Sequence, residues 1–205
     1  MPRDKTASHV LVEAAMREEF LEKGFENASV RSIADRAGMS AAGLYRHYRN
    51  KEDMFDALVD PFLSEMNSWL DHHRNSKYEM VNQGGADRDA LFGESFIDLV
   101  KEVIYPHRDE FRLLLVGAKG TKYENFLHDF VNEQQKDMTR AFEYMKAHGY
   151  STNVPEQEEL HMLLSAYTTA LFEPIIHGYS SEKMEHCLDT LNRFFMPGWL
   201  NIMGL

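Results

Sequence analysis

The sequence has 205 residues, with 22 lysines and arginines against 33 aspartates and glutamates, which gives a formal net charge of −11 at pH 7. This charge excludes a protein that coats nucleic acid regardless of sequence, because phosphates repel an acidic surface. Hydrophobic residues make up 43% of the chain, which is typical of a globular protein with a buried core. The single cysteine, Cys187, excludes a disulfide framework, and we find no signal peptide or membrane span, so we expect a soluble cytoplasmic protein with no membrane partner.

Apolar residues recur with a period near 3.6 along almost the whole chain, and strand-like alternation is hard to find. Serines, prolines and glycines stand where helices would begin and end. The pattern predicts an all-α protein of about nine helices, at about 6–24, 30–37, 41–48, 51–74, 89–104, 107–116, 121–148, 155–177 and 181–195. We expect a loop over 75–88 and a C-terminal tail, 197–205, that folds back on the core or on a partner chain.

Charge is distributed unevenly along the chain. Residues 1–53 hold nine basic and nine acidic groups, so residues 54–205 carry the whole excess of negative charge. Within 36–51 there are four basic residues and no acidic one. The acidic composition of the whole chain is therefore compatible with a local site that binds an anion such as nucleic acid.

The segment from Ser29 to Arg49 has the spacing of a helix-turn-helix, whose second helix enters the major groove of DNA. Ala34 is small enough for two helices to cross closely, and Gly38 can adopt the left-handed conformation that reverses the chain. Leu44 would fill the small core between the helices. An ordinary αα-hairpin uses the same spacing, so spacing alone leaves both interpretations open, and the basic run favours DNA binding.

The motifs of residues 10–60 carry a resemblance to a known family. They are Glu22-Lys23-Gly24-Phe25, Ser29-Val30-Arg31-Ser32-Ile33-Ala34, Ala37-Gly38-Met39-Ser40, Leu44-Tyr45-Arg46-His47-Tyr48 and Asn50-Lys51-Glu52-Asp53-Met54. This segment closely resembles the DNA-binding domain of TetR-family transcriptional regulators. The resemblance implies a helix-turn-helix DNA-binding domain over 1–53, with a recognition helix at about 41–48, and a helical ligand-binding and dimerisation domain over 54–205. It also implies a homodimer that binds a palindromic double-stranded DNA operator, as a repressor, and releases it when a small inducer binds.

The resemblance also assigns roles to residues by position. It implies that base edges are faced by Ala41, Ala42, Gly43 and Arg46, and that phosphates are held by Tyr45, His47 and Lys51 with the hydroxyl of Ser29. The Ala41-Ala42-Gly43 stretch departs from the family, whose members often carry bulkier or polar side chains there. Direct readout would then depend on Arg46 and on methyl contacts with thymine.

Helices in the C-terminal part have the pattern of a dimer interface. The predicted helix 155–177 has two apolar stripes, and 181–195 has one. A helix that is apolar on two sides needs two neighbours, which a second copy of the chain can supply in a symmetric four-helix interface. We therefore expect a homodimer through these two helices, although a central helix in a monomer would show the same pattern.

Aromatic residues and methionines between these helices are candidates for an inducer site. Each stripe taken alone is more typical of core, but an adaptable helical interior is also how an apolar cavity is built. Because the family usually has such a cavity, we expect an apolar or aromatic inducer. The candidate ligand-binding residues are Phe62, Met66, Trp69, Phe96, Tyr123, Phe126, His161 and Tyr167.

Two other functions stay open at this point. An all-α metal-dependent enzyme could use Glu158 and His161, which have the spacing of half a di-iron site. We find no second such pair, no nucleotide-binding glycine motif and no nucleophile elbow, so we expect no catalytic residue, no metal and no cofactor. A constitutive DNA-binding dimer without an inducer is the second alternative. The sequence identifies neither the inducer nor the operator.

Overall fold

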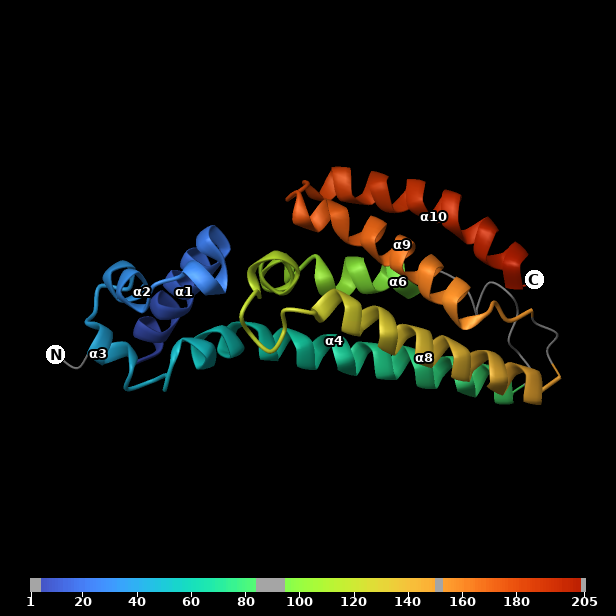
Figure 1. The fold of residues 1–205 in the computed structure, drawn as a ribbon, viewed down its shortest axis with the longest axis horizontal. Coiled ribbons are helices and arrows are strands. Elements are labelled where there is room, and N and C mark those ends of the chain that lie inside the picture. Colours follow the sequence, from blue (N-terminus) through green and yellow to red (C-terminus); the bar gives the residue numbers. More distant parts are fainter. Residues whose placement is uncertain (1–4, 84–94, 150–152, 204–205) are drawn as a thin grey trace. The chain divides into compact units, whose positions relative to one another are not determined.

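The computed structural model describes residues 5–83, 95–149 and 153–203 (Figure 1). Within these ranges the chain forms nine α-helical segments and two π-helical turns and contains no strand, which confirms the predicted all-α class. None of the helices in the described part is both long and apolar enough to cross a lipid bilayer. The chain divides into two compact units: the described residues of Met1–Glu65 with His107–Phe126, and those of Met66–Pro106 with Leu127–Leu205.

The first unit has a small core built by short helices. It contains α1 (Lys5–Asn27), α2 (Val30–Arg36), α3 (Ala41–Leu44), the beginning of α4 (Lys51–Asn82), α7 (Arg108–Arg112) and the π-helical turn η2 (Leu113–Gly117). Its fully buried side chains come from all of these elements and include Phe20, Ile33, Leu44, Met54, Phe55, Phe111 and Leu113. Burial of these large apolar groups, each worth about 1.5–3 kcal/mol, stabilises helices too short to be stable alone.

Gly24 lies within α1 at the position where the sequence predicted its end. Its φ of 68° is outside the helical region, so the chain kinks there before continuing to Asn27. A Cβ atom at Gly24 would lie 3.7 Å from the carbonyl oxygen of Gly117. This is an ordinary contact distance, so the positive φ of the kink, and not the approach of η2, is the reason for glycine at this position.

The second unit is a bundle of longer helices. It contains the remainder of α4, α6 (Ser95–Leu99), the π-helical turn η1 (Val100–Ile104), nearly all of α8 (Phe126–Ala147), α9 (Gln157–Ile176) and α10 (Ser181–Met203). Helices α4 and α8 run side by side, and α9 and α10 pack against each other (Figure 1). Phe96 of α6 contacts Phe130 of α8 and Tyr167 of α9, with ring centroids 6.4 and 5.7 Å apart. These contacts join the helices into one core.

Two helices are longer than predicted. Helix α4 continues to Asn82, so the loop expected from residue 75 is wrong over that stretch, and residues 84–88 lie outside the described part. The reason is packing, since Val81 is buried and the ring of Tyr78 lies 4.6 Å from that of Tyr144. Likewise α10 continues through Pro197 to Met203 instead of folding back. Burial of Trp199 outweighs the backbone hydrogen bond that the proline removes.

Other helices are shorter or less regular than predicted. The helix expected over 121–148 begins at Phe126, because Thr121 caps a turn by donating to the carbonyl of Ala118 and accepting from the N–H of Tyr123. The helices expected over 89–104 and 107–116 are each completed by a π-helical turn, and residues 89–94 of the first lie outside the described part. Apolar periodicity does not distinguish these turns from α-helix.

Candidate nucleic-acid interface

Helices α2 and α3 are joined by a turn at Gly38, which has a φ of 66°. The N–H of Met39 donates to the carbonyl of Ala34 at 3.0 Å and closes the turn. Ser40 then caps α3, because its hydroxyl accepts from the N–H of Gly43 at 3.1 Å. Ala34 is buried where the two helices cross. The predicted helix-turn-helix geometry is therefore present.

The second helix of this motif is shorter than the expected 41–48. The α-helical segment ends at Leu44, and tighter turns continue to Tyr48, with N–H groups of His47 and Tyr48 both donating to the carbonyl of Leu44. Gly43 weakens helix propensity at this point. Leu44 and Tyr48 are buried, which holds the segment against the rest of the unit.

A buried carboxylate ties α2 to α1. Glu19 is fully buried, and its oxygens accept from the ammonium of Lys23 at 2.8 Å and from the backbone N–H of Ser29 at 3.0 Å. The hydroxyl of Ser32 donates to it at 2.7 Å, and the guanidinium of Arg36 lies 3.3 Å away. Burial raises the pKa of Glu19, but the hydrogen bonds from Lys23, Ser32 and Ser29 outweigh it and lower the pKa to about 2. This side chain therefore fixes the start of α2.

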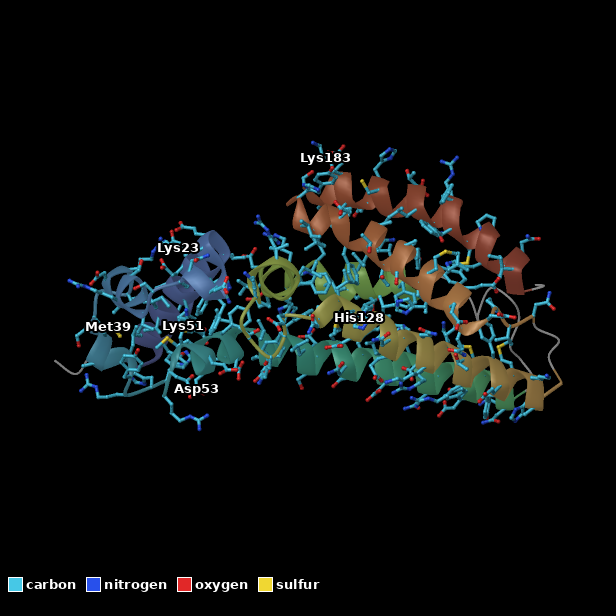
Figure 2. All side chains as sticks on the ribbon, in the orientation of Figure 1. Lys23, Met39, Lys51, Asp53, His128 and Lys183 are labelled. Atoms are coloured by element: carbon cyan, nitrogen blue, oxygen red, sulfur yellow. The ribbon has the colours of Figure 1, made fainter. Side chains whose placement is uncertain are left out.

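Lys51, a predicted phosphate contact, has three acceptors within the protein. Its ammonium donates to the carbonyls of Phe25, Glu26 and Ala28, at 2.6, 3.3 and 3.1 Å. It also lies 4.4 Å from the centroid of the Phe25 ring. Figure 2 shows Lys51 within the first unit. In this arrangement the charge of Lys51 compensates the carbonyls at the C-terminal end of α1.

Most cations of the segment 9–53 are engaged by nearby acids. The pairs are Arg17 with Glu110, Lys23 with Glu19, Arg36 with Glu18, Glu19 and Glu22, and Arg49 with Asp53. Lys51 is held by carbonyls, as described above. Of the arginines and lysines in this segment, only Arg31 and Arg46 contact neither a carboxylate nor a carbonyl group, and both are exposed. These two guanidinium groups can bind an external anion without breaking an internal bond.

Arg31 is a candidate that the sequence analysis missed. It lies in the first turn of α2, close to the N-cap residue Ser29. Asp35, four residues further along the sequence, carries the opposite charge, but the two side chains form no ion pair in the structure. Arginine placed before the acid is the less favourable order in a helix. The feature that marks Arg31 as a candidate is an exposed guanidinium without a partner, and this feature is visible only in the structure.

The predicted recognition residues differ in exposure. Ala42, Tyr45, Arg46 and His47 are exposed, and half of the Tyr45 surface is accessible. Ala41 is partly buried and Gly43 is buried, with its N–H bound to Ser40. Ser29 is exposed, and its hydroxyl forms no cap for α2. The exposed side chains on α3 and the following turn are therefore few, and most of them are polar or basic.

The candidate ligand residues fall in both units. In the first, Phe62 and Phe126 both pack against Phe111, with ring centroids 5.8 and 5.9 Å apart. The hydroxyl of Tyr123 donates a hydrogen bond to Asp60. Burial is the larger cause, and this carboxylate the smaller one, of a raised pKa at Tyr123. These contacts make a local core.

The remaining five candidates lie in the second unit. Phe96 and Tyr167 are in contact, and burial raises the pKa of Tyr167 to about 12. Met66 is buried, and Trp69 donates its indole N–H to Glu102 at 2.8 Å. His161 pairs with Gln135 at 3.0 Å, and its ring lies 6.1 Å from that of His128, which Figure 2 labels.

The acidic, histidine and cysteine side chains bear on the metal-dependent alternative. In the described ranges, no three of these groups are arranged so that they could hold a metal ion.

Comparison with known proteins identifies the family of the N-terminal segment. Residues 11–58 match the family model of bacterial regulatory proteins, tetR family. The HTH-type transcriptional repressor KstR2 of Rhodococcus jostii (strain RHA1) is 30% identical over 108 residues, which are 50% of this chain and 49% of that protein. The chain thus matches about half the length of this curated relative.

Two solved structures support the fold over a longer range. A protein of Mesorhizobium loti MAFF303099, assigned to the TetR family, has a TM-score of 0.55 and 16% identity, covering 99% of this chain and 100% of its own. The TetR-family regulator PfmR of Thermus thermophilus has a TM-score of 0.53 and 23% identity, covering 81% of this chain and 84% of its own. These matches are regulators rather than enzymes. The family model therefore identifies residues 11–58 as a DNA-binding domain of the TetR type, and the longer fold is similar to that of solved TetR-family structures.

Proposed function

We propose that this protein is a DNA-binding transcriptional repressor that acts in the cytoplasm as a homodimer on a palindromic operator, and that a small apolar or aromatic inducer releases it. DNA binding is assigned to residues 1–53, and ligand binding and dimerisation to 54–205. One observation carries the proposal: the helix-turn-helix exposes two arginines, Arg31 and Arg46, that have no partner within the segment 9–53 or elsewhere in the described ranges.

The two arginines have different proposed roles. Arg46 follows α3, and a guanidinium there can donate two hydrogen bonds to a guanine in the major groove. Arg31 lies at the N-terminal end of α2 close to Ser29, where a backbone phosphate is the favourable ligand. Tyr45 and His47 would add phosphate contacts. A phosphate contact by Lys51 would have to share its ammonium with three carbonyls, so we assign that residue mainly to holding the α1–α2 junction.

The dimer is proposed to form through α9 and α10. Met162 on α9 is 61% exposed and Phe194 on α10 is 75% exposed. Ala166 and Thr169 continue the exposed stripe of α9 at helical spacing. Large apolar groups on two adjacent helices are costly in water and favour an isologous four-helix contact. A dimer would also present two helix-turn-helix motifs to two half-sites about one DNA turn apart.

Release by an inducer is proposed as a population shift. Helix α4 contributes residues to both compact units, so a ligand in the second unit can bias the first through a continuous helix. Only a ligand that binds better to the conformation unsuited to DNA can shift the equilibrium. By linkage, operator DNA must weaken ligand binding by the same factor.

Selection of bound sequences from random DNA tests the proposal. We expect an enriched palindrome with two half-sites. Arg46→Ala should relax the preference at one position per half-site, whereas Arg31→Ala should weaken all sequences alike and flatten the salt dependence by about one unit. Arg49→Ala is the matched control, because Arg49 is equally basic and exposed but paired with Asp53. Failure to enrich any palindrome would overturn the proposal.

A further inference from the structure

Within the second unit, one stripe of α4 places polar groups among buried apolar ones. Met66 and Val81 are buried, 3% and 4% exposed, and mark the two ends of this stripe. His73 and Lys77 lie between them at steps of seven, four and four residues, which keeps all four on one helix face. A core-facing stripe therefore carries two side chains that are capable of hydrogen bonding.

The ring of His73 is held in a fixed position. It stacks on Trp69 with centroids 3.5 Å apart and an interplanar angle of 18°. Trp69 is itself fixed, because its indole N–H donates to Glu102 of η1 at 2.8 Å. The Nδ1 atom of His73 is buried, and among the described residues no protein group hydrogen-bonds to it. A buried nitrogen without a partner costs about 1–3 kcal/mol, so such atoms call for an explanation.

The neighbouring charged groups already have interaction partners. Burial lowers the pKa of Lys77. The carboxylate of Asp98 is close enough to oppose this lowering. Glu102 accepts from Trp69. The segment that supplies Glu102 is the π-helical turn η1, in which Tyr105 donates to the carbonyl of Val100 at 2.8 Å. π-Helical turns within helices are frequent at functional sites.

We propose that Nδ1 of His73 is the polar anchor of the inducer site, and that the inducer is an uncharged apolar molecule with a hydroxyl group that hydrogen-bonds to it. This inference rests on the proposed function. A hydroxyl both donates and accepts, so it fits either tautomer of a neutral imidazole. Asp98 already interacts with Lys77, and Glu102 accepts from Trp69, so a charged ligand would have to compete with these contacts, whereas an uncharged one leaves them in place.

Two other candidates for the polar contact, Tyr123 and His161, already have partners. Tyr123 donates to Asp60, and His161 pairs with Gln135. A ligand that displaced those partners would leave a polar group unpaired, whereas a hydroxyl at His73 satisfies one.

The test uses the 205-residue chain carrying Trp199→Phe. The chain has two tryptophans, so this substitution leaves Trp69 alone. The probes are pairs that exchange a hydroxyl for a methyl group: cyclohexylmethanol with ethylcyclohexane, and 2-decalol with 2-methyldecalin. Neither pair absorbs where tryptophan does, so Trp69 fluorescence reports binding. We expect each alcohol to bind about tenfold more tightly than its methyl counterpart, the upper end for one net hydrogen bond.

Two variants locate the contact. His73→Phe keeps a ring for stacking but removes the nitrogen, and should reduce the preference for the alcohol to one or below. Its unfolding midpoint should equal or exceed that of the parent, because a buried unpaired group has been removed. His72→Phe is the control, since His72 is exposed beside it, and should keep the preference.

Three results would overturn the inference: equal affinities within each probe pair, a preference that survives His73→Phe, or no response of Trp69 to any probe. Operator selection on the same protein separates this failure from that of the proposed function. An enriched operator together with any of these results leaves the regulator and removes the His73 site. Failure to enrich an operator removes the proposed function, whatever the probes show.

Discussion

Replacement of Glu19 by glutamine should destabilise the fold strongly although it changes one atom of the side chain. Glu19 is fully buried between α1 and α2, and its carboxylate accepts from Lys23, Ser29 and Ser32. Glutamine keeps the shape but removes the charge, and its amide nitrogen cannot accept. The variant therefore loses its charge-assisted bonds. Whichever way the amide lies, its NH2 group faces a donor that cannot accept: Lys23 and the N–H of Ser29 on one side, or the guanidinium of Arg36 on the other.

The magnitude follows from the pKa. The fall from 4.5 to about 2, at about 1.4 kcal/mol per pKa unit, corresponds to about 3 kcal/mol. Lys23 is 42% exposed, so water screens part of its interaction and we take about 2–3 kcal/mol. Because the folded-state pKa is lowered, this stabilisation is complete above the unfolded value of 4.5 and is lost as pH falls toward 2. At pH 3 only about 1 kcal/mol should remain.

The assay is urea unfolding followed by far-UV circular dichroism at pH 7 and at steps down to pH 3. Hydrogen exchange of the amides in α2 and α3 reports the same loss locally. Glu22→Gln is the matched control, because Glu22 is on the same helix and pairs with Arg36 but is 50% exposed, so its loss should cost under about 1 kcal/mol. Equal destabilisation by the two variants, or a difference that does not shrink toward pH 3, would refute the reasoning.

Three further substitutions test other parts of the account. Met162→Glu and Phe194→Glu should each shift sedimentation from dimer to monomer, whereas Lys183→Glu, at the start of α10, should not; three unchanged dimers would place the interface elsewhere. Lys51→Ala should lower the free energy of urea unfolding by about 1–3 kcal/mol, since three carbonyls lose a donor, and an unchanged value would return Lys51 to a phosphate role. Gly38→Ala should cost about 1–2 kcal/mol in thermal unfolding, because its φ of 66° disfavours a Cβ. That cost is conformational alone, as no atom would lie within 4 Å of the new Cβ, so a loss near zero would mean that the turn has another geometry.

Local rules predicted the parts of the fold that local chemistry determines. The all-α class follows from apolar periodicity, and the turn at Gly38 and the Ser40 cap follow from residue type and spacing. The ends of α4 and α10 depend instead on tertiary burial of Val81 and Trp199, which periodicity near the helix ends does not reveal. The π-helical turns have no distinct apolar pattern, so they could not be predicted.

Roles of charged residues were harder to predict, because charge counts do not show pairing. Lys51 and Arg31 illustrate the two ways in which such a prediction can be wrong. Lys51 belongs to the basic run of 36–51, yet its ammonium contacts the α1 carbonyls, whereas Arg31 is close in sequence to an acid that it does not contact. The role of His73 was also missed: the predicted helix 51–74 already places Trp69 and His73 four residues apart, but only the structure shows that the rings stack and that Nδ1 of His73 is buried without a partner among the described residues.

The central claim is that the exposed arginine after α3 reads bases. The most direct test is the affinity of the parent protein, Arg46→Ala and Arg49→Ala for the selected operator and for a scrambled duplex, at one fixed salt concentration. The account predicts that Arg46→Ala lowers the ratio of operator to scrambled affinity by about 1–3 kcal/mol, while Arg49→Ala leaves that ratio unchanged. Equal ratios for all three proteins would contradict it.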